Sequence, residues 1–387
     1  MRVQTRKTHS GARLQQLRAR LLKENEQNQR SPSSLPVDAL RPPLSDAFGR
    51  RHTYLRISLT ERCNLRCTYC MPVDGADLTP SPGLLTFAET MRLARLFVAL
   101  GVNKIRLTGG EPTLRRDLVE VCSALRALPG VDILAMTSNG VLLGGAGGGA
   151  APLLVALHSA GLTHLNISLD TLQRDRFERI TRRPAVQWDR VMAAIQGALA
   201  LGMGQVKVNV VVSRGVNDDE VANFVALTAT TPLTVRFIEL MPFSGNDWAP
   251  DRTIASGELV RRILDCHPGF SPVGAPGGGN ATENLWALPG SAGRVGFISS
   301  MSDAFCSSCN RLRLTADGHL KVCLHGSDEM NLRDRVRAGA DDAELAAAIA
   351  GALGRKHAAL GGNHDMQGIA AAVQNGTNAR AMVRIGG

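Results

Sequence analysis

Residues 54–70 read YLRISLTERCNLRCTYC and join a short run typical of a strand to three closely spaced cysteines. We expect the strand to cover residues 54–59. Cys63, Cys67 and Cys70 follow it at once in a Cys-x3-Cys-x2-Cys pattern, which we place in a loop after the strand. The rest of the fold is predicted outward from this strand and loop.

Short β-branched runs and helical stretches alternate after the cysteine loop. Further strands are expected at residues 104–108, 132–137, 164–169, 206–212 and 234–239. Helical patterns lie at residues 87–100, 117–128, 152–160, 175–180, 188–201 and 218–229. This alternation is typical of a parallel sheet with crossover helices, and six repeats predict an α/β fold, a partial (β/α)6 TIM-type barrel. The active face of such a barrel lies at the C-terminal ends of its strands.

The chain changes character beyond residue 269. After a helix at residues 257–266, a Pro- and Gly-rich segment indicates a boundary. Short antiparallel strands are expected at residues 285–288, 294–298, 311–315 and 319–322, followed by a helix at residues 341–353. We therefore divide the chain into a flexible basic tail (1–49), the partial barrel (50–269) and a C-terminal α+β extension (270–387).

The net charge of +10 is concentrated at the start of the 387-residue chain. The first 50 residues hold 10 basic and 4 acidic side chains, so an excess of only 4 positive charges remains for the rest. That excess suits an anionic small molecule, and with 4% aromatic residues the chain offers few stacking platforms for a nucleic acid. We expect no nucleic acid among its partners.

The sequence also predicts the compartment. The longest stretch without charged residues, 133–169, is broken by polar residues, glycines and a proline, so we expect no membrane span. The start of the chain lacks the apolar segment of a secretory signal. A cytoplasmic location follows, where clustered cysteines serve metal or redox chemistry. The Arg-rich tail also resembles an organellar transit peptide, although Glu24 and Glu26 favour a mobile tail.

The first cysteine triplet is suited to an iron–sulfur cluster. Three thiolates within one loop can bind three irons of a cubane cluster and leave the fourth iron open to a small molecule. A structural zinc site needs four ligands, and no fourth Cys or His follows Cys63, Cys67 and Cys70 at a suitable distance. We therefore predict a [4Fe–4S] cluster here.

A second triplet, Cys306, Cys309 and Cys323, lies in the C-terminal extension. With His325 as a fourth ligand, this segment taken alone suits a structural zinc ribbon. Two three-cysteine sets in one chain favour two [4Fe–4S] clusters, each with an open iron. The fold expected for the C-terminal part is thus an α+β iron–sulfur extension, with the zinc ribbon as its competitor.

The first triplet, with Tyr69 before its last cysteine and Gly109-Gly110-Glu111-Pro112 after the second strand, resembles the radical S-adenosylmethionine superfamily. The resemblance implies that S-adenosylmethionine binds the open iron through its methionine part. It also implies that Tyr69 packs by the adenine and that the Gly-Gly-Glu backbone holds the amino group. A glycine turn allows such a close approach of backbone to ligand.

Motifs along the rest of the chain resemble one family, the GTP 3′,8-cyclases. They are CNLRCTYCMPVDG (63–75), IRLTGGEPTLRR (105–116), TSNG (137–140), NISLD (166–170), KVNVV (207–211), RFIELM (236–241), CSSCNRLR (306–313) and the final Ile385-Gly386-Gly387. The resemblance implies cyclisation of GTP to (8S)-3′,8-cyclo-7,8-dihydroguanosine 5′-triphosphate, the first step of molybdenum cofactor biosynthesis. Ser138 and the Gly/Ala-rich residues 144–151 depart from the family pattern.

The family resemblance also implies roles for individual residues. Contacts to GTP are implied for Arg56, Arg106, Thr137, Lys207, Arg236, Arg311, Leu312 and Arg313, and contacts to S-adenosylmethionine for Tyr69, Gly110, Ser168 and Met241. In the family the second cluster's open iron binds the guanine base, which the Arg-Leu-Arg segment orients. Catalytic roles are implied for Arg311, Arg313, Gly386 and Gly387. Several converging guanidinium and ammonium groups are what a triphosphate requires.

The expected partners are GTP, an external one-electron donor of the flavodoxin or ferredoxin kind, and a downstream cyclic pyranopterin monophosphate synthase. The oligomeric state stays open, and a homodimer is compatible with the sequence. Two other functions are kept as alternatives. One is a peptide-modifying radical S-adenosylmethionine enzyme with an auxiliary cluster, and the other is a zinc-ribbon protein that binds nucleic acid.

Overall fold

The computed structural model describes residues 44–246, 248–274, 282–303, 305–376 and 380–386. Most of the expected tail, residues 1–43, therefore lies outside the described residues, as does Gly387. The last residues before the barrel pack against it: Leu44 is buried, and Asp46 accepts hydrogen bonds from the backbone and the side chain of Arg50.

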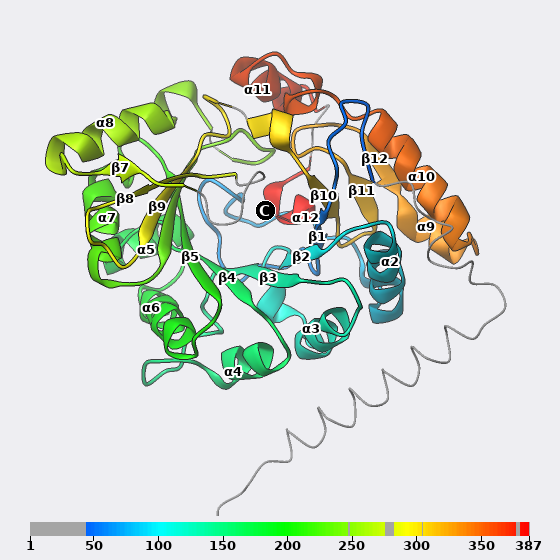
Figure 1. Cartoon of the computed structure of the whole chain (residues 1–387), viewed down its shortest axis with the longest axis horizontal. Coiled ribbons are helices and arrows are strands. Elements are labelled where there is room, and N and C mark those ends of the chain that lie inside the picture. Colours follow the sequence, from blue (N-terminus) through cyan, green and yellow to red (C-terminus); the bar gives the residue numbers. More distant parts are fainter. Residues whose placement is uncertain (1–43, 247, 275–281, 304, 377–379, 387) are drawn as a thin grey trace, which may run out of the picture.

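Six parallel strands in chain order form the centre of one sheet (Figure 1). Each strand pairs with the next in parallel, which confirms the expected partial barrel. On β1, Leu55 and Ile57 are fully buried in the core, whereas Arg56 between them lines a cavity on the opposite side, as the twofold alternation of a strand requires. The strands are β1 (Tyr54–Ser58), β2 (Lys104–Thr108), β3 (Ile133–Ser138), β4 (His164–Ser168), β5 (Gln205–Val212) and β6 (Thr234–Glu239).

Helices cover the outside of this sheet (Figure 1). The first begins at a capping box, in which the Thr86 hydroxyl accepts from the Glu89 backbone and the Glu89 carboxylate accepts from the Thr86 backbone. Pro152 occupies the first turn of another, where its missing N–H costs nothing. The helices are α2 (Phe87–Ala99), α3 (Leu118–Arg126), α4 (Pro152–Ser159), α5 (Arg174–Thr181), α6 (Val186–Ala200), α7 (Val221–Thr230) and α8 (Ser256–Cys266).

The C-terminal strands extend the barrel sheet at both edges. β10 (Arg311–Leu314) pairs in parallel with β1, and β9 (Arg294–Ile298) pairs in parallel with β6. The expected antiparallel pairs are present between β9 and β8 (Asn284–Ala287) and between β10 and β11 (His319–Lys321). The sheet ends at β7 (Ser271–Pro272) on one side and at β12 (Glu329–Asn331) on the other, so the barrel is open. The strand patterns alone did not predict the parallel pairings, because a short strand carries no signal for its partner.

The remaining helices are α9 (Leu332–Arg337), α10 (Asp342–Gly354), α11 (Met366–Gln374) and α12 (Met382–Ile385). Of these, the sequence predicted only α10. Figure 1 shows α12 at the centre of the barrel, and Val383 and Ile385 are buried there. Across the part of the chain that the structure describes, no helix combines the length and the apolar character that crossing a membrane would need.

Candidate active site

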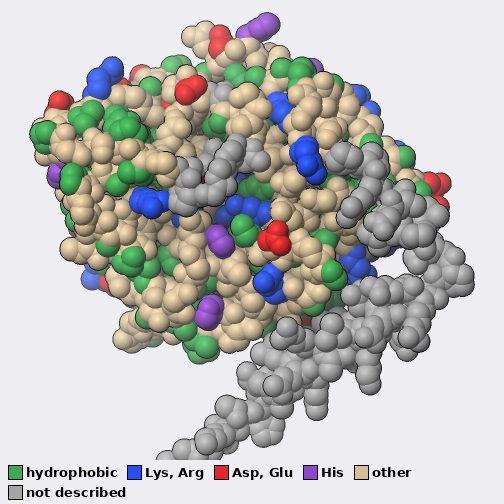
Figure 2. All heavy atoms as spheres, viewed as in Figure 1, with side chains coloured by type: hydrophobic (Ala, Val, Ile, Leu, Met, Phe, Trp, Pro, Cys, Tyr) green, Lys and Arg blue, Asp and Glu red, His purple; other side chains and the backbone are tan. Residues whose placement is uncertain are grey.

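A cavity of about 640 Å³ lies between the barrel strands and the C-terminal segments. Figure 2 shows Lys and Arg side chains gathered at the centre of this face of the molecule. The cationic side chains that line the cavity are Arg56, Lys104, Arg106, Lys207, Arg236, Arg294, Arg311 and Arg313. So many guanidinium and ammonium groups in one enclosed space favour a multiply charged anion.

Three arginines lie side by side on neighbouring strands. The strand register pairs Arg56 of β1 with Arg106 of β2 on one side and with Arg313 of β10 on the other. Burial, together with repulsion from Arg311, lowers the pKa of Arg313 to about 10, and burial and Arg313 lower the pKa of Arg56. Positive charges that are held together away from water in this way are stabilised by a bound anion.

Arg106 is fixed by several acceptors. Its guanidinium donates to the Tyr54 hydroxyl, to the Met136 carbonyl at 3.2 Å and to the Thr137 hydroxyl at 3.4 Å. Thr137, expected to contact the substrate, is thus brought to Arg106. Tyr54 also carries the Lys104 ammonium 4.8 Å from its ring centre. The aromatic ring and the two cations form one wall of the cavity.

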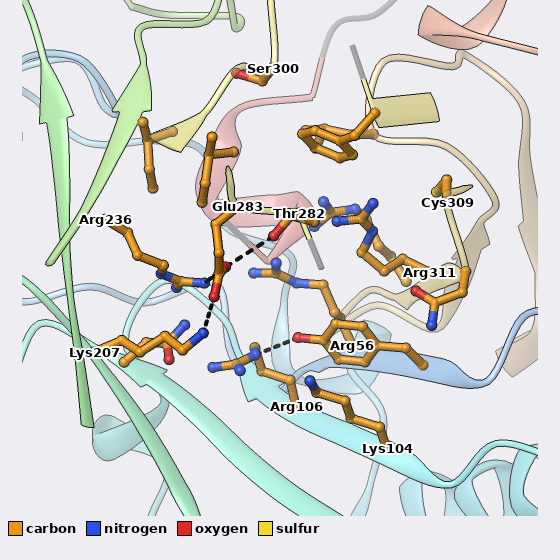
Figure 3. Close-up of a pocket in the computed structure, with 18 of the residues that line it drawn as sticks. Arg56, Lys104, Arg106, Lys207, Arg236, Thr282, Glu283, Ser300, Cys309 and Arg311 are labelled. Atoms are coloured by element: carbon orange, nitrogen blue, oxygen red, sulfur yellow. Dashed lines mark hydrogen bonds and ion pairs between the residues drawn. The ribbon is translucent and has the colours of Figure 1, made fainter. Parts of the chain in front are cut away.

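Lys207 and Arg236 lie on β5 and β6 and converge on Glu283, which no sequence signal had singled out (Figure 3). Asn209 accepts two further hydrogen bonds from Arg236, at 2.9 and 2.6 Å. Burial and the neighbouring Arg236 lower the pKa of Lys207 to about 8, against the opposing effect of Glu283.

The C-terminal segment reaches the arginine row. The Gly386 carbonyl accepts from Arg56 and from Arg313, both at 3.3 Å. Gly386 has φ +70°, and a Cβ there would lie 2.5 Å from the Thr108 hydroxyl, so only glycine fits. The structure therefore brings Gly386 together with the cationic residues, whereas Gly387 lies outside the described residues.

On β10, the side chains of Arg311 and Arg313 lie on one face of the sheet and that of Leu312 on the other. Arg311 and Arg313 line the cavity, and the Arg311 guanidinium lies 4.6 Å from the centre of the Phe305 ring. The Leu312 side chain is fully buried in the core, on the other face of the sheet. Any contact of Leu312 with a ligand in the cavity would have to come from its backbone.

The first cysteine triplet lies in the loop after β1. All eight cysteines of the chain are free thiols. Within the loop, the Cys70 backbone N–H donates to the Cys67 carbonyl at 3.0 Å, and burial raises the pKa of Cys70 to about 12. Three thiols on one short, half-buried loop are a donor set that suits a [4Fe–4S] cluster, with Cys63, Cys67 and Cys70 as the residues that would hold it.

The Gly109-Gly110 turn lies against this loop with no room for side chains. A Cβ on Gly110 would meet the Arg62 carbonyl at 2.4 Å. The turn is anchored by Glu111, which is buried and accepts from the Ser138 hydroxyl at 2.8 Å and from the Asn139 backbone at 2.7 Å. Glu111 was part of the quoted motif, but its anchoring role depends on β3 and was not predicted.

The other residues expected around S-adenosylmethionine gather at the ends of β4 and β6. The Tyr69 hydroxyl donates to Asp170 at 2.8 Å. Asn246, which the sequence did not point to, donates to the carbonyls of Tyr69 and Met241 at 3.0 and 2.9 Å. Ser168 ends β4, next to Asn209 of β5.

The second triplet is assembled from two segments. Cys306 lies within a short 3-10 turn (Phe305–Ser308), Cys309 directly follows this turn, and Cys323 follows β11. Backbone Leu360 donates to the Cys306 sulfur at 3.5 Å, and the Lys356 ammonium donates to the Cys309 sulfur at 3.4 Å. These donors favour thiolates and suit sulfurs that ligate a cluster.

His325, the fourth zinc ligand considered for this segment, stacks on the Phe243 ring at 6.0 Å and lines the cavity. Across the described ranges, no three His, Cys, Asp or Glu side chains converge tightly enough to hold a single metal ion. Lys356 is also hydrogen-bonded to His52 at 2.8 Å, and Arg50 donates to the Cys306 carbonyl at 2.8 Å. These supporting residues come from distant parts of the sequence, so no local motif could have indicated them.

A barrel of parallel strands with a cysteine loop after its first strand is the arrangement of the radical S-adenosylmethionine enzymes, and residues 57–228 match the Radical SAM superfamily. Residues 233–361 match the family Molybdenum Cofactor Synthesis C. Among solved structures, Streptococcus suis SuiB shares the fold, with a TM-score of 0.51 at 13% identity over 76% of this chain and 67% of that chain. A [4Fe–4S] cluster and S-adenosylmethionine are therefore cofactors of this chain.

Full-length comparisons narrow the class. The chain is 42% identical to a GTP 3′,8-cyclase of Moorella thermoacetica, over 89% of this chain and 100% of that protein. It is 49% identical to the mitochondrial GTP 3′,8-cyclase of Arabidopsis thaliana, over 89% and 83%. The chain belongs to the GTP 3′,8-cyclase family. Its match to Molybdenum cofactor biosynthesis protein 1 of Drosophila melanogaster is 52% identical over 81% of this chain, but spans only 54% of that protein.

Proposed function

We propose that the chain cyclises GTP to 3′,8-cyclo-7,8-dihydroguanosine 5′-triphosphate in the first step of molybdenum cofactor biosynthesis. The observation that carries the proposal is one cationic cavity that the second cysteine triplet lines and that the C-terminal Gly386 reaches through Arg56 and Arg313. Membership in the GTP 3′,8-cyclase family supports the same conclusion.

In this proposal the cationic side chains hold the triphosphate. Arg56, Arg106, Lys207 and Arg236 line the cavity on four barrel strands and would bind the phosphates through charge-assisted hydrogen bonds. When bound, the first cluster and S-adenosylmethionine supply the 5′-deoxyadenosyl radical that takes hydrogen from the ribose 3′ carbon. The barrel keeps water out, and the fixed strands hold the sugar and the base in the orientation that ring closure requires.

The second triplet is assigned a second [4Fe–4S] cluster, bound by Cys306, Cys309 and Cys323. The N–H donors from Lys356 and Leu360 to two of these sulfurs support this assignment. All three cysteines line the cavity, so a cluster held by them would be available to bind the guanine base, which Arg311, Arg313 and Gly386 would position. Tyr69, Gly110, Ser168 and Met241 would surround S-adenosylmethionine.

The proposed partners follow from this chemistry. Reductive cleavage of S-adenosylmethionine needs a one-electron donor, for which a flavodoxin or ferredoxin is suited, and the cyclised nucleotide needs a cyclic pyranopterin monophosphate synthase to consume it. We place the enzyme in the cytoplasm, and its oligomeric state stays open, with a homodimer compatible with the sequence. The mitochondrial name of the Arabidopsis relative makes the organelle the alternative location.

The proposal is tested by anaerobic incubation of the reconstituted protein with S-adenosylmethionine and dithionite, and with GTP, ATP or no nucleotide. We expect 5′-deoxyadenosine and an isomer of GTP to accumulate with GTP alone. When an arginine of the cavity such as Arg106 is replaced by alanine, Arg174→Ala is the matched control, because Arg174 is exposed and does not line the cavity. Equal 5′-deoxyadenosine in all three samples would show that GTP is not the substrate.

A further inference from the structure

Glu283 holds an unexpected position for an acidic residue, because it lies inside the cationic cavity. Its side chain is only 7% exposed. One carboxylate oxygen accepts from the Lys207 ammonium, and the other accepts from Arg236 at 3.1 Å and from the Thr282 hydroxyl at 3.4 Å. Figure 3 shows Lys207 and Arg236 both pointing at Glu283. The Glu283 carboxylate therefore already forms ion pairs with two of the cations that would bind the triphosphate.

The fold makes room for this carboxylate. Glu283 comes directly before β8, and its side chain crosses β9 at Gly296 to enter the cavity. A Cβ on Gly296 would lie 3.1 Å from the Glu283 Cβ and 3.4 Å from the Arg236 Cγ. A larger residue at position 296 would crowd both partners of the ion pair, so the absence of a side chain there lets them meet.

Lys207, Arg236 and Glu283 lie at the far side of the cavity from the second cysteine triplet. Figure 3 shows Cys309 and Arg311 on one side and the ion-paired residues on the other. In the proposed function, on which this inference rests, the guanine base lies near Cys309. A phosphate chain that extends from the base across the cavity would then bring its terminal phosphate to Lys207 and Arg236.

A terminal phosphate and the Glu283 carboxylate compete for the same two cations. The carboxylate offsets two buried positive charges, which would otherwise be costly. Burial raises the pKa of Glu283, but Arg236 and Lys207 outweigh it and lower the pKa to about 2, so the group is ionised at neutral pH. Once a phosphate arrives, two anions share one small space and repel each other.

We propose that Glu283 is a displaceable internal counter-ion of the terminal-phosphate site, and that it determines which anions the site accepts. A phosphate with two negative charges gains more from Lys207 and Arg236 than a carboxylate does, so it replaces Glu283. A singly charged anion gains no such advantage and is rejected. Glu283 is thus a specificity-determining residue for the length and charge of the phosphate chain.

Equilibrium binding to the reconstituted protein tests this proposal. GTP, GMP and inorganic tripolyphosphate would be titrated calorimetrically into the wild type, Glu283→Gln and Glu283→Asp without divalent cations. We expect Glu283→Gln to bind GTP and tripolyphosphate about tenfold more tightly, the factor that one charge-assisted hydrogen bond is worth. GMP affinity should stay unchanged, because its single phosphate does not reach Lys207 and Arg236.

Two further variants make the result decisive. Glu283→Asp keeps the charge but shortens the reach, so it should tighten tripolyphosphate binding less than Glu283→Gln, and it provides the answer if the glutamine variant does not fold. Asp132→Asn is the matched control, since Asp132 is an exposed acidic residue at the cavity that is hydrogen-bonded to Asn103. Asp132→Asn should bind tripolyphosphate with the affinity of the wild type.

Unchanged or weaker binding of tripolyphosphate to both Glu283 variants would overturn the proposal, because the carboxylate would then remain in place beside the phosphate. Weaker binding that depends on added Mg²⁺ would overturn it too, in favour of a cation shared by Glu283 and the phosphates. If Glu283→Gln tightened tripolyphosphate binding but 5′-deoxyadenosine formed equally with GTP, with ATP and without nucleotide in the incubation described above, Glu283 would keep its role and the proposed GTP function would fail.

Discussion

The two cysteine triplets of this chain are built in opposite ways. Cys63, Cys67 and Cys70 share one loop, and burial raises the pKa of Cys70 to about 12. Cys309 is also buried, but the nearby Arg311 and Lys356 outweigh burial and lower its pKa to about 7. Burial disfavours the thiolate at all three cysteines of the first triplet, whereas in the second triplet burial raises the pKa of Cys306 but the neighbouring cations lower that of Cys309.

The difference teaches how each site depends on the rest of the molecule. The cysteines of the first triplet all come from one loop, which other barrel segments support through the Gly109-Gly110 turn and the carbonyls of Ile180 and Thr181. The second needs β10 and β11, Lys356 and the N-terminal residues Arg50 and His52, which lie more than 250 positions away in sequence. A change at Lys356, Arg50 or His52 should therefore damage the second site and spare the first.

The largest effect is expected from removing the cysteines themselves. Cys67→Ala should reduce 5′-deoxyadenosine formation to the level of a protein-free sample, because the first cluster loses a ligand. Cys309→Ala should lose the cyclised nucleotide but keep GTP-dependent 5′-deoxyadenosine formation, because the cationic side chains of the cavity would still bind the triphosphate while the first cluster stays intact. Chromatography measures both products. Iron analysis should show that each variant has lost half of its iron.

Cys122→Ala is the control for this pair, because Cys122 is fully buried on α3 and belongs to neither triplet. It should keep the full iron content. If Cys309→Ala abolished cofactor cleavage as completely as Cys67→Ala, the two triplets would not be functionally separate and the comparison would fail.

The next effect concerns the C-terminal segment. Gly386→Ala forces a side chain into φ +70° and places its Cβ 2.5 Å from the Thr108 hydroxyl, so the segment should withdraw from the arginine row. We expect the rate of nucleotide cyclisation to fall about 100-fold, which is typical when a positioning contact moves by about 1 Å. Product formation at saturating GTP measures it.

Gly376→Ala separates backbone strain from the clash. Gly376 has φ +71°, and a Cβ there would meet no atom within 4 Å. The two substitutions carry the same conformational cost, but only the one at position 386 crowds the cavity. Equal losses in both variants would contradict a positional role for Gly386.

The sequence could predict the features that depend on one local segment, such as the first triplet, but not those assembled from distant segments, such as the second. The barrel strands and the Cys63 loop were predicted because periodicity and spacing are local signals. The row of Arg56, Arg106 and Arg313 depends on strand register, and Glu283 reaches the cavity only because Gly296 leaves space on β9. Such contacts arise between segments that have no sequence relationship, so a motif search passes over them.

Lys356 tests whether distant residues support the second site. Lys356→Met removes the donor to the Cys309 sulfur while keeping an apolar side chain of similar length. Iron release from the proposed second cluster to a chelator should become about 10- to 100-fold faster, the usual cost of losing a supporting contact to a metal ligand. The first cluster should release iron at the wild-type rate.

Arg355→Met is the control, because this exposed neighbour donates only to the Gly351 carbonyl among the contacts that the structure gives it. Its clusters should release iron as the wild type does. Faster release from the first cluster in Lys356→Met would mean that the substitution loosens the whole protein, and the proposed local support would then be wrong.

The smallest effect concerns an ion pair that joins the barrel to the C-terminal extension. Glu89 at the start of α2 pairs with Arg337 of α9, and Arg337 lowers the pKa of Glu89 to about 2 against the effect of burial. Glu89→Gln keeps an acceptor for the Thr86 backbone and removes only the charge. Urea unfolding at pH 7 should show a loss of about 1 kcal/mol, since the pair is partly exposed.

The pH dependence distinguishes this charge from packing. Because the folded state holds the pKa of Glu89 below its ordinary value of 4.5, the stabilisation is complete above pH 4.5 and is lost as the pH falls toward 2. The wild type and Glu89→Gln should thus differ at pH 7 and converge as the pH approaches 2. Asp189→Asn, in an exposed pair with Arg174 within the barrel region, should cost almost nothing at either pH. A Glu89→Gln deficit that persisted at pH 2 would assign the contact to packing, and the two regions would then be joined without help from this ion pair.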